Sequence, residues 1–220
     1  MARVFLTGAT GYMGRPLATE LVACGHEVRA LARAGSESRL PAGCLPVIGD
    51  ALRAPTFQSS VTGCDTLVHL VGVSHPSPAK AAQFRSIDLA SARESVAAAR
   101  ATQVRHFIYV SVAHPAPVMR EYIAARSEAE EAVRAAALTA TILRPWYVLG
   151  PGHYWPYLLL PVYWMAAAIP ATRAGAARLG LVTLREMVTA LVYAVENPPV
   201  VTRIVEVPQI RRAVQAKSAR

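Results

Sequence analysis

The sequence predicts an α/β fold built on a doubly wound parallel sheet. Short apolar runs alternate along the chain with longer segments of helical periodicity, as they do in consecutive βαβ units. Several of the apolar runs lack polar alternation, which is typical of strands covered on both faces. A glycine-rich turn joins the first apolar run to the first helical segment. Because no repeat or linker divides the chain, we expect a single domain over residues 1–220.

The same patterns predict the individual elements. Strands are expected at residues 3–7, 27–32, 45–48, 66–71, 106–111, 140–143 and 203–207, and helices at 12–23, 79–101, 120–136 and 184–196. Thr183 and Glu186 form a Thr-x-x-Glu capping box at the start of the last helix. In the helix before it, Arg126, Glu130 and Arg134 follow each other at i,i+4 spacing, which predicts a solvated face.

Composition excludes a disordered chain and argues against a nucleic-acid interface. The 220 residues are 53% hydrophobic and carry a formal net charge of +9. Only Lys80 and Lys217 are lysines, and the arginines are spread along the chain without a dense basic run. The basic tail, with Arg211, Arg212 and Arg220, allows contact with anionic lipid or RNA, but a solvated end is the expected interpretation.

Cysteines and histidines predict neither a disulfide framework nor a metal site. Cys24, Cys44 and Cys64 are odd in number and form no CxxC pair, so we expect small buried side chains in a reducing compartment. The six histidines include no HExxH pattern. Gly8 comes too early for the apolar region of a signal peptide, which predicts a cytoplasmic protein.

Residues 7–14 read Thr-Gly-Ala-Thr-Gly-Tyr-Met-Gly and lie between the first predicted strand and the first predicted helix. Gly8 permits a sharp turn, Gly11 lets the backbone approach a pyrophosphate, and Gly14 lets the helix pack closely on the sheet. The helix N-terminus then offers free N–H groups to the phosphates. This is the Rossmann arrangement, and its predicted dinucleotide contacts are Thr7, Gly8, Thr10, Gly11, Tyr12, Met13 and Gly14.

Arg33 favours NADP(H) over NAD(H) as the nucleotide. It ends the second predicted strand, at the place where an NAD site usually has an acidic residue for the ribose 2′-hydroxyl. A guanidinium suits a 2′-phosphate instead. The alternative is an ordinary surface arginine, which would leave NAD(H) as the lesser possibility.

Taken together, several segments resemble the atypical short-chain dehydrogenase/reductase superfamily, in its NAD(P)H-binding, NmrA-like and epimerase/dehydratase-like branches. Besides the glycine turn they are Ala30-Leu31-Ala32-Arg33, Gly49-Asp50, Phe107-Ile108-Tyr109-Val110-Ser111, Thr141-Ile142-Leu143-Arg144-Pro145 and Gly150-Pro151-Gly152. The resemblance follows nearly the whole chain in order. It implies an NAD(P)-dependent oxidoreductase with further cofactor contacts at Asp50, Ala51, Val71, Gly72 and Pro145, of which Asp50 lies beside the adenine and Val71-Gly72 along the path to the nicotinamide.

The resemblance also implies a catalytic Tyr-x-x-x-Lys pair with a hydroxyl residue at the end of the fifth strand. The matching pair here is Tyr122 and Arg126, which lie on one helical face, so that the guanidinium favours the phenolate. A planar guanidinium does not replace an ammonium group in every respect. Ser111 is the candidate hydroxyl, although Val112 is the other residue that aligns with this position. A non-catalytic redox sensor or complex-assembly protein is therefore the alternative to an enzyme.

The stretch from Pro145 to Thr172 contains no charged residue and all three tryptophans. Three interpretations are open: a helix closing a substrate pocket, a face for a second copy or a protein partner at 154–170, and a peripheral membrane contact. A spanning helix is not expected, because residues 155–169 are too few and are interrupted by Pro156 and Pro161.

A pocket is the first choice, since in the family this region covers the nicotinamide end. We expect a small C-terminal substrate cap at 146–182, with Trp146, Tyr147, His153 and Trp155 as substrate contacts. The predicted reaction is NADPH-dependent reduction of an apolar carbonyl, enone or quinone-like substrate, without a metal.

Overall fold

A seven-stranded parallel sheet forms the centre of the protein. The computed structural model describes residues 1–116, 118–152, 158 and 160–218. The strands run in the order β3-β2-β1-β4-β5-β6-β9, so the chain winds outward from β1 in one direction and from β4 in the other. The predicted doubly wound Rossmann sheet is confirmed. Its strands are β1 (Arg3–Thr7), β2 (Glu27–Ala32), β3 (Leu45–Ile48), β4 (Thr66–His69), β5 (His106–Val110), β6 (Ala140–Arg144) and β9 (Arg203–Glu206).

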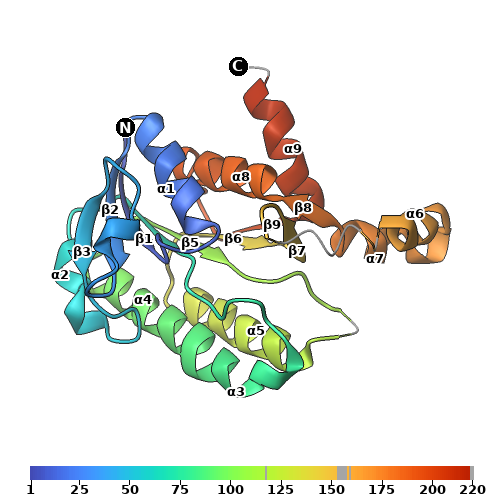
Figure 1. Cartoon of the computed structure of the whole chain (residues 1–220), viewed down its shortest axis with the longest axis horizontal. Coiled ribbons are helices and arrows are strands. Elements are labelled where there is room, and N and C mark those ends of the chain that lie inside the picture. Colours follow the sequence, from blue (N-terminus) through green and yellow to red (C-terminus); the bar gives the residue numbers. More distant parts are fainter. Residues whose placement is uncertain (117, 153–157, 159, 219–220) are drawn as a thin grey trace.

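Helices cover both faces of the sheet (Figure 1). One face carries α1 (Gly14–Ala23), α8 (Leu184–Glu196) and α9 (Val207–Ser218); the other carries α2 (Gln58–Val61), α4 (Ala90–Ala101) and α5 (Arg120–Ala135). Successive strand side chains point to opposite faces. Val4 and Leu6 therefore join the core beneath α1 and α8, whereas Phe5 joins the core beneath α4 and α5. The two buried layers explain why these strands read as continuous apolar runs.

The helix expected at 79–101 is interrupted in the structure. It begins with a 3₁₀ turn, η3 (Pro78–Lys80), and a single turn, α3 (Ala81–Gln83), and continues as a π-helical segment, η4 (Phe84–Leu89), before α4. A π-helical turn shifts the helical face and is common at functional sites. Here η4 contributes the fully buried Asp88.

The region between β6 and α8 was expected as a cap, and four elements lie in the part of it that the structure describes. β7 (Tyr147–Leu149) and β8 (Leu181–Thr183) pair as a small parallel sheet, and α6 (Leu160–Ala168) and α7 (Pro170–Arg178) project from the body between them (Figure 1). The capping box of α8 is confirmed, because the Thr183 hydroxyl accepts from the Glu186 N–H at 3.1 Å and Glu186 accepts from the Thr183 N–H at 2.6 Å.

Two expectations from the sequence are wrong in the described structure. The Arg126–Glu130 face of α5 is not solvated, since the two side chains are 6% and 1% exposed. Cys24 is exposed and not buried, although Cys64 is buried as expected. The basic tail is helical through Ser218, and its first two residues, Arg211 and Arg212, are exposed.

Two further features concern only the residues that the structure describes. Among them, no helix is both long and apolar enough to cross a bilayer. Within the same residues, no three side chains of histidine, cysteine, aspartate or glutamate are grouped so that they could hold a metal ion.

Candidate nucleotide and active site

The glycine turn between β1 and α1 is closed by its own backbone. Gly8 has φ +74°, a conformation that favours glycine, and a Cβ there would lie 2.9 Å from the carbonyl carbon of Leu70. The Gly11 N–H donates to the Gly8 carbonyl at 3.0 Å. A Cβ at Gly14 would lie 2.0 Å from that same carbonyl oxygen, so no side chain fits at this position. The turn thus brings the start of α1 against the ends of β1 and β4.

The start of α1 fits a pyrophosphate. No side chain caps this helix terminus, and its first turn holds no acidic residue, so its positive end is not neutralised locally. A Cβ at Gly11 would meet only the Gly8 carbonyl oxygen, at 3.1 Å, so the space around that position is otherwise open. A cleft of about 730 Å³ opens beside the turn, lined by Thr10, Gly11, Tyr12, Arg15, Pro16, Thr19, Pro41, Ala42, Pro151 and Leu184. The residues present therefore suit the phosphates of a dinucleotide.

Other residues of the turn support it from inside the protein. The Thr7 hydroxyl is fully buried and hydrogen-bonds the His69 ring at 3.0 Å; Ser95 also bonds this ring, at 2.9 Å. Burial, and secondarily Arg126, lowers the pKa of His69 to about 3, so the ring is neutral. The Tyr12 hydroxyl reaches the Val148 carbonyl at 3.5 Å and thereby connects the turn to β7. Thr7 and Tyr12 thus hold the turn in place.

Arg33 and Asp50 lie after neighbouring strands on the side of the sheet away from β4. Arg33 follows β2 and is exposed. Asp50 follows β3, and its carboxylate accepts the Leu52 N–H at 2.9 Å, so it also caps a turn. Ala51 packs partly buried against the core beneath α4 and α5.

Val71 and Gly72 follow β4 at the carboxyl edge of the sheet, where nucleotides bind in folds of this type. The backbone of Val71 closely approaches Gly8. A Cβ at Gly72 would lie 2.3 Å from an Arg126 nitrogen and 3.1 Å from an Asp88 oxygen. Only a glycine therefore leaves room for the Arg126–Asp88 pair beneath this segment.

Arg126 is locked in a buried ion pair. Its Nη2 donates to the Asp88 carboxylate at 2.6 Å and its Nη1 to the Val110 carbonyl at 2.8 Å, while Asp88 also accepts the Val73 N–H at 2.9 Å. Burial raises the pKa of Asp88, and Arg126 and the Val73 N–H oppose that shift. Burial alone would lower the pKa of Arg126, but its neighbours raise it, so the guanidinium stays charged. The pair ties η4 and α5 to the ends of β4 and β5.

Tyr122 lies one helical turn before Arg126, and the structure brings the two together as expected. The Arg126 Cζ is 5.2 Å from the Tyr122 ring centroid, and the Phe84 ring packs on the phenol at 5.0 Å. Burial raises the pKa of Tyr122; Arg126 lowers it, and Asp88 raises it further. At neutral pH the phenol is therefore protonated and able to donate a proton.

Ser111 directly follows β5 and lies beside a more distant part of α5 than Tyr122. Its hydroxyl is buried beside Glu130 and helps to lower the pKa of that carboxyl, although its oxygen makes no hydrogen bond of ordinary geometry. Glu130 follows Tyr122 by two helical turns, about 12 Å along the axis. Among the described residues, no hydrogen bond joins Ser111 to Tyr122. Val112, the other candidate for this position, is buried and apolar.

Aromatic side chains follow β6 at the same edge of the sheet. Trp146 and Tyr147 are half-buried and make an edge contact at 5.5 Å. Pro145 is held by a hydrogen bond from the Ala113 N–H to its carbonyl, at 2.9 Å. His153 and Trp155, the other predicted substrate contacts, lie outside the described residues.

Asp88 and Phe84 were not found from the sequence. Both lie in η4 and contact the Tyr122–Arg126 pair. Asp88 is one of several charged residues in the predicted helix at 79–101, and its position there gives no sign of a partner 38 positions away. A search for a counter-ion to Arg126 would have been the way to find it, since a buried arginine needs one.

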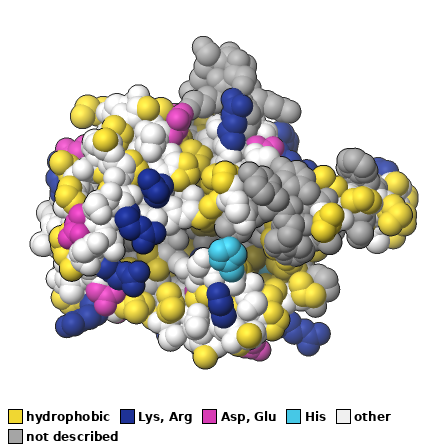
Figure 2. Space-filling view, in the orientation of Figure 1, with side chains coloured by type: hydrophobic (Ala, Val, Ile, Leu, Met, Phe, Trp, Pro, Cys, Tyr) yellow, Lys and Arg dark blue, Asp and Glu magenta, His cyan; other side chains and the backbone are white. Residues whose placement is uncertain are grey.

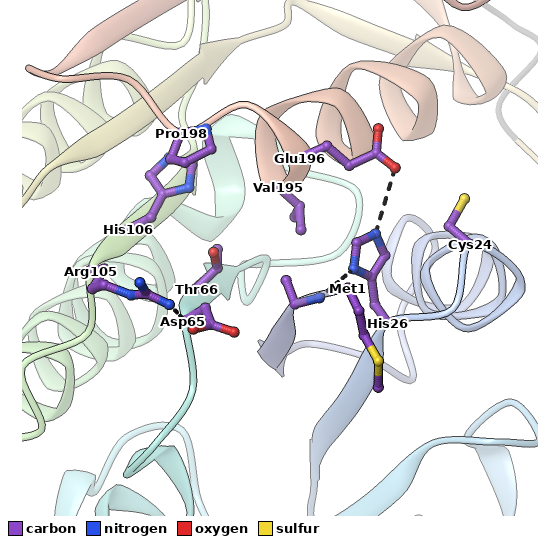
Figure 3. A pocket seen from close by; sticks show the side chains of 11 residues that line it. Met1, Cys24, His26, Asp65, Thr66, Arg105, His106, Val195, Glu196 and Pro198 are labelled. Atoms are coloured by element: carbon purple, nitrogen blue, oxygen red, sulfur yellow. Dashed lines mark hydrogen bonds and ion pairs between the residues drawn. The ribbon is translucent and has the colours of Figure 1, made fainter.

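A second cavity, of about 430 Å³, lies at the opposite edge of the sheet (Figure 3). It is next to the starts of β1, β4 and β5 and is lined by Asp65, Arg105, His106 and Glu196, among others. His26 accepts from the Ala2 N–H and faces Glu196 at 3.6 Å. Because nucleotides bind at the carboxyl ends of parallel strands, this cavity is separate from the nucleotide site.

The fold has close counterparts among solved structures. The Bordetella bronchiseptica enzyme WbmH, solved in complex with NAD+, superposes with a TM-score of 0.69 over 100% of this chain and 82% of its own, at 20% identity. This likeness concerns the fold alone.

Two curated relatives are reductases by name. Ceramide reductase from Caulobacter vibrioides is 28% identical over 95% of this chain and 65% of its own length. The 4-hydroxy-2-methyl-3-oxo-4-farnesyl-3,4-dihydroquinoline-1-oxide ketoreductase from Stigmatella aurantiaca is 29% identical over 67% of this chain and 51% of its own. The chain thus spans about half to two thirds of the length of these relatives.

The family assignment comes from the sequence model for NAD(P)H-binding proteins, which matches residues 8–151, well over half of the chain. The match begins at Gly8 of the phosphate turn and includes Asp88, Tyr122 and Arg126. It confirms a nicotinamide dinucleotide as the cofactor and an oxidoreductase-like protein of the atypical short-chain dehydrogenase/reductase type. The chain belongs to the NAD(P)H-binding family.

Proposed function

We propose that this protein is an NADPH-dependent reductase of a carbonyl, enone or quinone-like group in an apolar substrate. The observation that carries the proposal is the contact of the Tyr122 ring with Arg126, whose guanidinium lies directly beneath Gly72; burial raises the pKa of the phenol there. Reduction of a carbonyl needs a proton donor beside the hydride donor, and a phenol with a high pKa is such a donor.

In this proposal each side chain has one task. NADPH supplies the hydride when it is bound, and Tyr122 gives a proton to the substrate oxygen. Arg126 stabilises the phenolate that remains, because a positive charge near the ring favours the ionised form. Asp88 keeps the guanidinium beneath the ring through its bond of 2.6 Å. The phenol recovers its proton from solvent, which its half-buried position allows.

An apolar substrate is supported by two independent observations. Trp146 and Tyr147 follow β6 and offer aromatic surface at the carboxyl edge of the sheet. Gly72, which follows β4, lies at the same edge. The two relatives act, by their names, on a ceramide and on a farnesyl-bearing quinoline oxide, and both compounds carry long apolar chains. We infer that the cap residues contact such a chain.

The proposed nucleotide preference rests on Arg33. This exposed side chain follows β2, whose neighbour β1 ends at the phosphate turn. A guanidinium there would pair with a 2′-phosphate through charge-assisted hydrogen bonds.

The catalytic role is tested with Tyr122→Phe. The phenyl ring keeps its packing on Phe84 and Arg126, so nucleotide affinity should stay nearly unchanged while turnover falls by about 10²–10⁴-fold. NADPH oxidation against a panel of apolar ketones, enones and quinones gives the rate. Tyr109→Phe is the matched control, because Tyr109 also contacts Arg126, at 3.5 Å, but is fully buried in the core. Equal losses in both variants would contradict the assignment.

The contribution of Arg126 is tested by the pH dependence of the same reaction. A general acid works only while protonated, so reduction should be independent of pH near neutrality and should fall as pH rises above the phenol pKa, which burial raises from its usual value of 10. Arg126→Lys should preserve or raise activity, whereas Arg126→Ala should move the alkaline fall to higher pH. An unchanged alkaline limb in Arg126→Ala would exclude this role.

The nucleotide preference is tested by calorimetric titration of NADPH and NADH. NADPH should bind more tightly, and Arg33→Ala should narrow the difference by about 1–3 kcal/mol. Arg39→Ala, which removes another exposed arginine, should leave the difference unchanged. Equal affinities in the unmodified protein would refute the preference.

One observation favours the alternative of a non-catalytic NADP-binding sensor or assembly protein. Arg126 is committed to Asp88 and the Val110 carbonyl, so it has less freedom to reach a ribose than a lysine would. If neither the unmodified protein nor Arg126→Lys turns over any substrate while NADPH still binds, this second function replaces the first.

A further inference from the structure

The helical hairpin α6–α7 projects from the body with apolar side chains exposed. α6 contains no charged residue, and Met165, in its middle, is 63% exposed. Leu158, before the helix, and Ile169, at the junction with α7, are 81% and 53% exposed. In the space-filling view, hydrophobic side chains gather on this arm (Figure 2). A helix without a polar face is normally buried in a protein core or in lipid, so something is expected to cover α6.

The segment that carries this apolar surface has charge of one sign. From Pro145 to Leu184 the sequence holds no acidic residue, and its two arginines, Arg173 and Arg178, both lie in α7. Next to them, Arg211 of α9 donates from Nε to the Leu181 carbonyl at 3.0 Å, which fixes its guanidinium beside the hairpin. The surface that covers α6 must therefore tolerate arginines and offer negative charge.

A pocket at the base of the hairpin combines both properties. It measures about 260 Å³ and lies among α6, α7, β8 and α9. Arg173, Arg211 and the Tyr163 phenol supply its polar lining, and Leu160 and Leu181 belong to its apolar lining. Such a lining suits a molecule with an anionic head and an apolar chain.

We propose that the α6–α7 hairpin docks on an anionic lipid bilayer, with α6 in the interfacial layer and the arginines at the head groups. The chemistry of the hairpin agrees, because α6 exposes apolar side chains and α7 carries both arginines, which is the combination found in interfacial segments. A symmetric contact between two copies is disfavoured, because it would bring two acid-free, arginine-bearing surfaces together. The proposal does not depend on the proposed reductase activity, although it would place the protein where apolar substrates dissolve.

Co-sedimentation with vesicles tests the docking. The full chain should bind vesicles enriched in phosphatidylserine, bind phosphatidylcholine vesicles much more weakly, and dissociate at high salt, because charges at a surface are screened. Met165→Asp and Ile169→Asp should each weaken binding by about tenfold or more, since an acid is placed on the interfacial surface. Both side chains are exposed, so folding should be preserved. Val200→Asp is the matched control, because Val200 is 95% exposed and lies outside the hairpin.

The arginines provide a second, independent set of variants. Arg173→Gln and Arg178→Gln should each lower affinity for phosphatidylserine vesicles by about fivefold. Arg39→Gln, an exposed arginine in η1 (Glu37–Arg39), should have no effect. NADPH binding should be unchanged in every hairpin variant, so a failure of docking is distinguishable from a failure of the nucleotide site.

Two results would overturn the proposal. The first is an unmodified protein that binds neither kind of vesicle. The second is a dimer in sedimentation-velocity runs that Met165→Asp dissociates, because the hairpin would then be covered by a second copy of the chain.

Discussion

Two buried carboxyl groups, Asp88 of η4 and Glu130 of α5, differ in the number of cations around them. Asp88 is fully buried and pairs with Arg126 alone. Glu130 lies on α5, one turn after Arg126. It accepts hydrogen bonds from Arg134 at 2.8 Å and from Arg144 Nε at 2.9 Å. The difference appears in their pKa values: burial raises that of Asp88 in spite of Arg126, whereas the arginine hydrogen bonds outweigh burial and lower that of Glu130.

This contrast separates a structural cluster from a candidate active-site cluster. Two arginines surround the single carboxylate of Glu130. Arg134 belongs to α5 and Arg144 to β6, so the cluster fastens the helix to the sheet. Around Asp88 one cation meets one anion, and the guanidinium also lies against the Tyr122 phenol. Asp88 therefore weakens the influence of Arg126 on the phenol, which helps to keep Tyr122 protonated.

The largest expected effect on stability is that of Asp88→Asn. The amide keeps the size of the side chain but leaves the Arg126 charge buried without a counter-ion, which should lower the free energy of unfolding by about 3–5 kcal/mol. Urea denaturation followed by circular dichroism measures it. Asp50→Asn, in a less buried turn, should change stability by less than about 1 kcal/mol. If Asp88→Asn also lowered the free energy of unfolding by less than about 1 kcal/mol, Arg126 would have found another partner.

Glu130→Gln should have a smaller effect, about 1–3 kcal/mol. The Arg134 side chain is 42% exposed and can be solvated, and Arg144 retains Glu206 at 3.9 Å. The same denaturation experiment compares the two carboxyl variants. A larger loss of unfolding free energy in Glu130→Gln than in Asp88→Asn would contradict this explanation, which is based on the number of cations around each carboxylate.

Gly72→Ala should destabilise by about 1–2 kcal/mol, because the new Cβ would meet Arg126 at 2.3 Å and force the guanidinium to move. Gly175→Ala is its control, since no atom lies within 4 Å of a Cβ there and alanine favours the helix. The control should be neutral or stabilising by up to about 1 kcal/mol. A neutral Gly72→Ala variant with unchanged NADPH affinity would contradict the close approach.

The smallest effect is expected in the shape of the acid stability profile. Glu130 has a lowered pKa in the folded state, so its contribution is complete above its ordinary value of 4.5 and is lost as pH falls through the folded pKa. Asp88 has a raised pKa, so its protonation does not remove stability in the same way. Glu130→Gln should flatten the decline in unfolding free energy below pH 4.5, and Asp88→Asn should not. Parallel profiles for the two variants would contradict the opposite pKa directions.

The sequence by itself determined the features that depend on local spacing. The glycine turn, the alternation of strands and helices, and the Thr183–Glu186 cap could all be read from neighbouring residues. The contact between Tyr122 and Arg126 was predictable for the same reason, because residues four apart share a helical face. Each of these features is fixed by the period of a helix or by the backbone freedom of glycine.

Only the tertiary structure decided which charges are buried and which apolar residues are not. The i,i+4 series on α5 indicated a solvated face, but η4 and β6 bring Asp88 and Arg144 onto it and exclude water. The uncharged stretch around α6 allowed a pocket helix, a partner face or a membrane contact, and only the structure shows that Met165 is exposed where the hairpin extends beyond the sheet. Sequence periodicity defines a face of a helix, whereas burial depends on what the rest of the chain packs against that face.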